Sequence, residues 1–378
     1  MITTLQITPL EHSSGIGARV TLPSYTSDPS KLNEKDFTTL SEALHRHLVV
    51  VIPGQKNLQP SSQYHLTARF DPSVTIDGAT SANYGHGKEF RHEKSVLKKD
   101  GKSVPHQPQV QILGQGSFEN HEGLESVDLT HPVHSSFHKD VLSEERVAAG
   151  ETRFYRWHID SALYGLSPPL CTTLLGIHVP KHTTKQRILY EDTGEELEVV
   201  QGATAFASGA TAFKLLSSED QKLALGTTVI YAPHPYIFIS PASATSDGLT
   251  MVSEDKECSM EELPPWEESK VKKLPLVWTN LVTGEHHLQA HGCCVWKLQR
   301  DDGTVLELLA AREELHRLMR PAISPSKIYT HAWEEGDLAI FFNRGVWHSV
   351  TGQFSEGERR LMHQCNIASG SDPSCLKI

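Results

Sequence analysis

The sequence predicts a mostly β protein, with a sandwich or barrel core and flanking helices. Short apolar runs that end at proline or glycine recur along the chain, which is typical of short buried strands. Helical apolar spacing is confined to a few segments, and it is clearest in 36–47 and 306–320. We expect the 378 residues to form a single domain, because β enzymes of this size are commonly built as one unit.

The first half of the chain begins with a helix and a buried strand. Range 36–47 repeats apolar residues at helical spacing, and the β-branched run 48–52 then ends at Pro53-Gly54. Range 76–107 is polar and rich in Gly, Lys and His, so we expect a long loop there. Long ordered loops in compact domains are usually functional.

The second half alternates apolar and polar segments. Range 171–179 predicts a core strand that ends at Pro180, 204–216 has a helix-like pattern, and 336–342 predicts a strand entered from a turn. Two further segments are rich in charged and small polar residues and are predicted to be surface insertions: 181–200 and 241–273.

Charge and targeting signals exclude several classes of protein. Thirty-five basic and 46 acidic residues give a net charge of −11, which disfavours binding to a phosphate backbone, so we expect no nucleic-acid partner. The N-terminus lacks the pattern of a signal peptide, and the apolar runs are too short to span a bilayer. Six cysteines without a C-x-x-C motif fit a reducing compartment, so we expect a cytoplasmic protein that does not contact membranes.

Two H-x-D triplets occur in the chain, at 138–140 and 158–160. On an extended backbone, residues i and i+2 point to the same face, so one triplet offers an imidazole and a carboxylate to a single metal. We favour His158 and Asp160, which precede a core strand, whereas the polar surroundings of His138 predict a solvated turn. Two histidines and one carboxylate leave three coordination sites open, which is typical of Fe(II) oxygenases that bind a 2-oxo acid and O2. A surface ion pair and a zinc hydrolase remain as alternatives.

A second motif follows the strand at 336–342. His348 ends the stretch Asn343-Arg-Gly-Val-Trp-His348, and Arg360 lies twelve positions further on. A strand, a turn and a returning strand would bring Arg360 alongside His348, where its planar fork matches a carboxylate such as that of 2-oxoglutarate. Arg359 should face the opposite side of the strand.

Together these motifs resemble the family of taurine dioxygenase and the 2,4-D dioxygenases, from about residue 36 to 368. The resemblance implies a double-stranded β-helix (jelly-roll) core with insertions, and a dioxygenase that uses Fe(II), 2-oxoglutarate and O2. It implies Fe(II) ligands at His158, Asp160 and His348, and it places Arg360 and Thr204 on the distal carboxylate of 2-oxoglutarate. The alternative for Thr204 is a helix N-cap. The matching elements are Trp157-His-Ile-Asp160, Gly202-Ala-Thr204, Thr279-Asn-Leu-Val-Thr-Gly284 and 336–363.

Gln364 stands where taurine dioxygenase has an arginine that grips the sulfonate of its substrate. Gln364 and Asn366 share one strand face, and a pair of amides suits a neutral heterocycle. These amides and the insertions resemble the fungal xanthine dioxygenases, which implies oxidation of xanthine at C8 to uric acid. Gln107 and Gln109 are weaker candidates for contacts with the purine. The alternative for the amides is a hydrogen bond to strand backbone or water.

Two other functions remain open. The same chemistry could act on a sulfonate, an aryloxyacetate or another small acid, or the chain could be a catalytically silent jelly-roll binding or sensor protein. The remaining aromatic and imidazole side chains near these motifs are expected to serve packing or surface roles: His286, His287, His291, His363 and Trp347.

Overall fold

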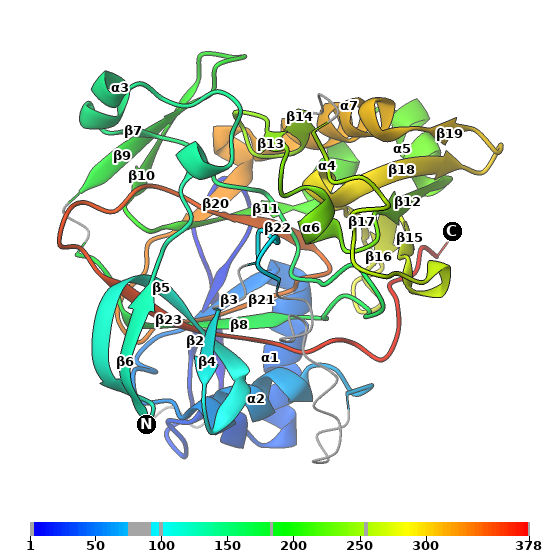
Figure 1. Ribbon diagram of the computed structural model, residues 1–378. Coiled ribbons are helices and arrows are strands. Elements are labelled where there is room, and N and C mark those ends of the chain that lie inside the picture. Colours follow the sequence, from blue (N-terminus) through cyan, green and yellow to red (C-terminus); the bar gives the residue numbers. More distant parts are fainter. Residues whose placement is uncertain (1–3, 75–91, 98–100, 182–183, 253–255, 377–378) are drawn as a thin grey trace.

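The computed structural model describes residues 4–74, 92–97, 101–181, 184–252 and 256–376. Its largest element is a nine-stranded sheet with the order β1-β2-β3-β21-β8-β23-β5-β4, in which β6 pairs with β5 (Figure 1). The strands of this sheet are β1 (Gln6–Pro9), β2 (Ala18–Thr21), β3 (Val49–Ile52), β4 (Lys102–Val104), β5 (Gln107–His121), β6 (Leu124–Leu129), β8 (Thr172–His178), β21 (Leu338–Phe341) and β23 (Arg360–Asn366).

A smaller sheet has the order β20-β11-β22 and packs on the large one. It consists of β20 (Ile328–His331), β11 (Thr204–Ser208) and β22 (Val346–Val350). The ring of Phe206 from β11 lies 5.3 Å, between centroids, from the ring of Phe341 on β21, so aromatic packing joins the two sheets. Two facing sheets confirm the expected jelly-roll core, since apolar residues from both layers share one interior.

The helix expected at 36–47 is confirmed as α1 (Glu34–His47). Its N-cap Asn33 accepts a hydrogen bond from the backbone N–H of Asp36, and Leu48 ends the helix in the left-handed conformation. The next strand, β3, is buried along its whole length, as its β-branched run predicts. Figure 1 shows α1 and α2 (Pro60–Arg69) beside the large sheet.

Strand β23 lies inside the large sheet, between β8 and β5, and is buried throughout. It pairs antiparallel with both neighbours, so that Gln364 lies opposite Leu174 of β8 and opposite Gln111 of β5. The strand predictions at 171–179 and 336–342 are confirmed as β8 and β21, which pair with each other. This register places side chains of β8 and β23 next to one another on the inner face.

The helix predicted over 204–216 is wrong in its first third. Residues Thr204–Ser208 form β11, and only Gly209–Leu215 forms a helix, α4. The run Thr-Ala-Phe-Ala-Ser is fully buried between β20 and β22, and short apolar runs do not distinguish strand from helix by periodicity. Ser208 is the N-cap of α4, which removes the helix-cap alternative for Thr204.

The two predicted insertions are more ordered than expected. Residues Lys185–Leu189 and Glu196–Val200 form the hairpin β9–β10, and β7 (Glu151–Thr152) pairs with β9. Range 241–273 contributes buried apolar side chains, among them Leu249 and Met251, and is therefore not a purely surface segment. Its short strands are β13 (Ser243–Ala244), β14 (Met251–Val252) and the start of β15 (Lys273–Pro275).

A further sheet has the order β15-β12-β18-β19 and carries the predicted C-terminal helix beside it, at the upper right of Figure 1. That helix is α7 (Leu308–Met319), which confirms the prediction for 306–320. The other elements here and around the core are β12 (Thr227–Tyr231), β16 (Val277–Thr279), β17 (His286–Leu288), β18 (Val295–Arg300), β19 (Val305–Leu306), α3 (Glu144–Ala148), α5 (Ser218–Leu225) and α6 (Pro235–Phe238).

The loop predicted over 76–107 is described only in part. Ranges 75–91 and 98–100 lie outside the described residues, but 102–104 form β4, and Gln107 begins β5. The loop prediction is wrong for these last residues, because their backbone pairs with the large sheet. Across the described ranges, no helix is long and apolar enough to cross a membrane.

Candidate metal centre and active site

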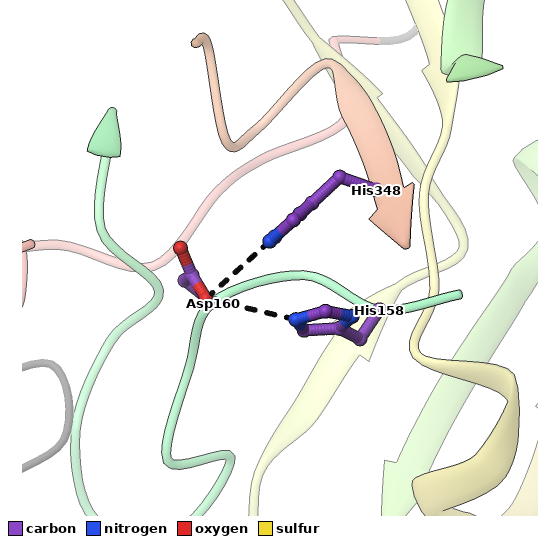
Figure 2. A group of neighbouring side chains, drawn as sticks. All are labelled: His158, Asp160 and His348. Carbon is purple, nitrogen blue, oxygen red and sulfur yellow. Dashed lines mark ion pairs between the residues drawn. The ribbon is translucent and has the colours of Figure 1, made fainter. Parts of the chain in front are cut away.

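Three side chains expected to bind a metal come together between the two sheets. His348 extends from β22, and His158 and Asp160 come from the segment before β8 (Figure 2). Asp160 Oδ1 lies 3.9 Å from Nε2 of His158 and 3.7 Å from Nε2 of His348. The ligand atoms of all three lie within 4.8 Å of one another, and this is the one such cluster among the described residues.

Backbone and side-chain hydrogen bonds orient His158 toward this centre. His158 and His348 exchange two backbone hydrogen bonds of 3.0 Å, so their imidazoles lie on the same side, with ring centroids 4.0 Å apart. Nδ1 of His158 donates to the carbonyl of Arg156 at 2.9 Å, which leaves Nε2 as the unprotonated nitrogen. Burial, reinforced by the neighbouring His348, holds the pKa of His158 well below its ordinary value and keeps the ring in the neutral form that binds metals.

The two oxygens of Asp160 have different surroundings. Oδ2 accepts hydrogen bonds from Thr172 Oγ1 at 2.7 Å and from Gln364 Nε2 at 3.0 Å, both from strands of the large sheet. Oδ1 faces the two imidazoles. The carboxylate is therefore held from behind, with one oxygen directed at the centre.

Asn343 fixes the backbone of Asp160, a role that the sequence reasoning missed. Its Oδ1 accepts from Asp160 N at 2.8 Å, and its Nδ2 donates to the carbonyls of Asp160 and Pro169 at 2.8 and 3.0 Å. The side chain is fully buried. The available signal was a polar residue, Asn343, directly after the run of core residues that ends at Phe342, one residue beyond β21.

The donor set fits a divalent iron. The distances of 3.7 and 3.9 Å from Asp160 Oδ1 to the two Nε2 atoms are too long for hydrogen bonds. The three side chains therefore converge on one point without hydrogen bonds between these atoms. Two imidazoles and one carboxylate on one side of a point leave the opposite side open, which is the arrangement of non-haem Fe(II) oxygenases.

Arg360 lies on β23, four residues before Gln364, the residue that donates to Asp160. It begins β23, is only 4% exposed, and has no Asp or Glu within ion-pair distance in the described part of the chain. Burial lowers the pKa of its guanidinium to about 10. A buried guanidinium without a counter-ion is costly, so this position calls for an anionic ligand. Arg359 is exposed on the opposite face, as predicted.

Thr204 and Arg360 both contact the side chain of Trp333. Its Oγ1 accepts a hydrogen bond from Nε1 of Trp333 at 3.0 Å, and Cζ of Arg360 lies 5.9 Å from the Trp333 ring. Gly202 packs against the same group, since a Cβ at this position would lie 3.2 Å from the ring of Phe354 and 3.9 Å from Arg360 Cδ. Neither Trp333 nor Phe354 was singled out from the sequence.

The predicted substrate amides fall into two groups. Gln364 and Asn366 are buried on the same face of β23, and both amide atoms of Asn366 lack a hydrogen-bond partner among the described residues. Gln107 and Gln109 are half-buried at the start of β5, where the amide of Gln107 donates to that of Gln109. The structure adds one contact that the sequence did not suggest, namely the hydrogen bond from Gln364 to Asp160.

The other H-x-D triplet does not join the centre. His138 was expected in a solvated turn, and this was wrong, because its ring is buried and its Nε2 bonds to the carbonyl of Tyr155 at 2.7 Å. Asp140 is exposed. The side chains assigned to packing or surface roles stay outside the metal cluster, and most of them are buried: His287, His291, His363 and Trp347.

Comparisons with known proteins agree with this geometry. The family model described as "Taurine catabolism dioxygenase TauD, TfdA family" matches residues 6–366. The chain is 50% identical over 345 residues to the alpha-ketoglutarate-dependent xanthine dioxygenase xanA of Emericella nidulans, covering 91% of each chain. It is 43% identical to the corresponding enzyme xan1 of Schizosaccharomyces pombe, covering 98% of this chain and 90% of that one.

A solved structure supports the fold. A putative alpha-ketoglutarate-dependent taurine dioxygenase from Burkholderia xenovorans superposes with a TM-score of 0.57 at 17% identity, over 98% of this chain and 94% of the other. At that identity the likeness concerns the fold alone. The family match over most of the chain and the two close relatives carry the assignment further: this chain belongs to the TauD/TfdA family of dioxygenases.

Proposed function

We propose that the protein is an Fe(II)- and 2-oxoglutarate-dependent dioxygenase that hydroxylates xanthine at C8. The reaction converts xanthine, 2-oxoglutarate and O2 into uric acid, succinate and CO2. The two relatives at 43% and 50% identity carry the name xanthine dioxygenase, and both are matched over nine tenths of their length or more. The family match over 6–366 supports a single dioxygenase domain, and a cytoplasmic location stays a prediction.

The observation that carries the dioxygenase chemistry is the buried guanidinium of Arg360, which has no Asp or Glu partner among the described residues. Arg360 lies on the same strand as Gln364, whose amide donates to Asp160 of the His–Asp–His cluster. We assign Fe(II) to His158, Asp160 and His348, with Asp160 bound through Oδ1. We assign the distal carboxylate of 2-oxoglutarate to Arg360, with Thr204 as a second contact. An Arg fork and a hydroxyl match the acceptors of a carboxylate.

When bound, Fe(II) and 2-oxoglutarate supply the oxidising chemistry by activating O2 as 2-oxoglutarate is decarboxylated. The chain's own contribution is orientation. His158 Nδ1 is tied to the Arg156 carbonyl, and the Asp160 backbone is tied to Asn343, so that the ligand atoms are held before metal binds.

Substrate recognition is assigned to the amides on β23. Gln364 and Asn366 lie on its inner face, and Gln107 and Gln109 extend the amide set on the neighbouring strand β5. Amides both donate and accept hydrogen bonds, as a purine-dione with N–H and C=O groups requires. No arginine occupies these positions, which disfavours a sulfonate or an aryloxyacetate.

The test is xanthine-dependent formation of succinate and uric acid by the purified protein with Fe(II), ascorbate, 2-oxoglutarate and air. We expect the two products in equal amounts. Succinate formation that does not respond to xanthine, but responds to another small acid, would contradict the proposed substrate while leaving the dioxygenase assignment in place. No succinate with any substrate would support the silent binding protein.

A further inference from the structure

The amide of Gln364 is partly committed before any substrate arrives. Its nitrogen lies 3.0 Å from Asp160 Oδ2, and a carboxylate oxygen at neutral pH only accepts hydrogen bonds. The orientation of the amide is therefore determined by chemistry, with Nε2 toward Asp160. Oε1 has no partner among the described residues and is not sealed from solvent, and the side chain is 8% exposed.

We propose that Gln364 connects substrate recognition to the metal ligand: Oε1 accepts a hydrogen bond from a ring N–H of the substrate while Nε2 donates to Asp160 Oδ2. This proposal rests on the proposed function, because it takes the N–H heterocycle as the substrate class. Gln364 is thus both a specificity residue and a positioning residue for Asp160.

The chemistry of one amide explains the selectivity. One of the two N–H groups of Nε2 is used on Asp160, and this bond fixes the position of Oε1. An acceptor fixed there favours a neutral N–H group and disfavours a sulfonate or carboxylate, whose oxygens are also acceptors. A hydrogen bond accepted at Oε1 polarises the amide and strengthens the bond that Nε2 donates, as in other hydrogen-bond chains. Substrate binding is then sensed at Asp160 without a direct contact between them.

Thr172 provides a matched control. Its Oγ1 donates to the same oxygen, Asp160 Oδ2, at 2.7 Å, from β8 rather than β23. Its side chain is fully buried and its hydroxyl is used in this bond. Replacing Thr172 by valine therefore removes a bond to the metal ligand and leaves the proposed acceptor for the substrate in place.

The experiment compares the wild type with Gln364→Met and Thr172→Val, using Co(II) as the metal in the absence of O2. Three quantities are measured: the affinity for Co(II), the affinity of the Co(II)–2-oxoglutarate complex for xanthine by calorimetry, and the change in the Co(II) absorption spectrum on adding xanthine. Both variants should bind Co(II) more weakly, on the order of 10–100-fold. Only Gln364→Met should lose xanthine affinity, by about tenfold or more, together with the spectral response.

Each other outcome is decisive. The proposal is overturned if Gln364→Met keeps wild-type affinity for xanthine or for Co(II), or if Thr172→Val weakens xanthine binding as much as Gln364→Met does. A wild type that does not bind xanthine would instead reject the proposed function, so the two failures are distinct. Thermal unfolding monitors folding, and Gln364→Ala, with the same expectations, replaces the methionine variant if that variant is insoluble.

Discussion

Replacing Arg360 by methionine separates binding of the co-substrate from stability of the fold. Methionine keeps much of the side-chain volume and removes the charge. The structure predicts opposite effects on the two properties, because the guanidinium is buried without a carboxylate partner among the described residues. A variant at an ordinary structural ion pair would lose stability instead.

The magnitudes follow from the pKa and from the hydrogen bonds. Burial lowers the pKa of Arg360 from 12.5 to about 10, which means that the folded protein disfavours the charged form. At 1.36 kcal/mol per unit, the charge costs the ligand-free protein about 3 kcal/mol at neutral pH. Two charge-assisted hydrogen bonds to a carboxylate contribute about 1.5–3 kcal/mol each, so their loss should weaken 2-oxoglutarate binding by about 100-fold or more.

Two assays check these values. Urea denaturation of the metal-free protein should show that Arg360→Met is as stable as the wild type, or more stable by up to about 3 kcal/mol. Titration of 2-oxoglutarate in the succinate assay should show the large rise in its KM, with a small change in the KM for xanthine. Arg359→Met is the control, because Arg359 is exposed on the other face and should change neither property.

The reasoning is refuted if Arg360→Met binds 2-oxoglutarate like the wild type. It is also refuted if the ligand-free variant loses several kcal/mol of stability, because this would mean that the guanidinium has a structural partner.

Three further predictions concern the metal centre and the buried histidines. Asp160→Ala should abolish Co(II) binding and turnover, whereas Asp140→Ala, in the other H-x-D triplet, should leave both intact. If Asp160→Ala still bound Co(II), the assignment of the three metal ligands would be wrong. Asn343→Ala loses three hydrogen bonds to the backbone of Asp160 and Pro169 and should cost about 3 kcal/mol of stability in urea denaturation. A loss below about 1 kcal/mol would contradict the role of Asn343 in fixing this backbone. Burial lowers the pKa of His363 to about 3 and that of His287 to about 4. As the pH falls below about 6.5, these histidines become protonated in the unfolded chain but stay neutral in the folded protein, which favours unfolding. These two histidines alone should lower the free energy of unfolding by about 3 kcal/mol between pH 7.5 and 5.5, and an unchanged urea midpoint would contradict this.

The sequence predicted much of the fold because its local signals are strong. The β-branched run before Pro53, the apolar run 171–179 and the amphipathic segment 306–320 each appear as the expected element. The strand at 204–208 was misread as helix because five buried residues carry no distinguishing period. Pairing with β20 and β22, which come more than one hundred residues later in the chain, decides its conformation.

Some residues of the candidate site were also predictable from the sequence, and others were not. The spacing of the H-x-D triplet and the position of Arg360 after a predicted strand indicated His158, Asp160 and Arg360 as candidates. The resemblance to the dioxygenase family added His348 as the third candidate ligand. The roles of Asn343 and Trp333 were not predictable, because a hydrogen bond of one side chain to another has no spacing rule along the sequence.

The sequence alone therefore indicated the class of chemistry, through local motifs and through the resemblance of their combined pattern to a known family. Only the tertiary structure decided how the ligands are held. It placed β8 and β23 side by side, so that Thr172 and Gln364 reach one oxygen of Asp160, and it buried Arg360 away from every described carboxylate. The physical reason is that a metal ligand's orientation depends on contacts between distant strands, and strand register is set by the packing of the whole core.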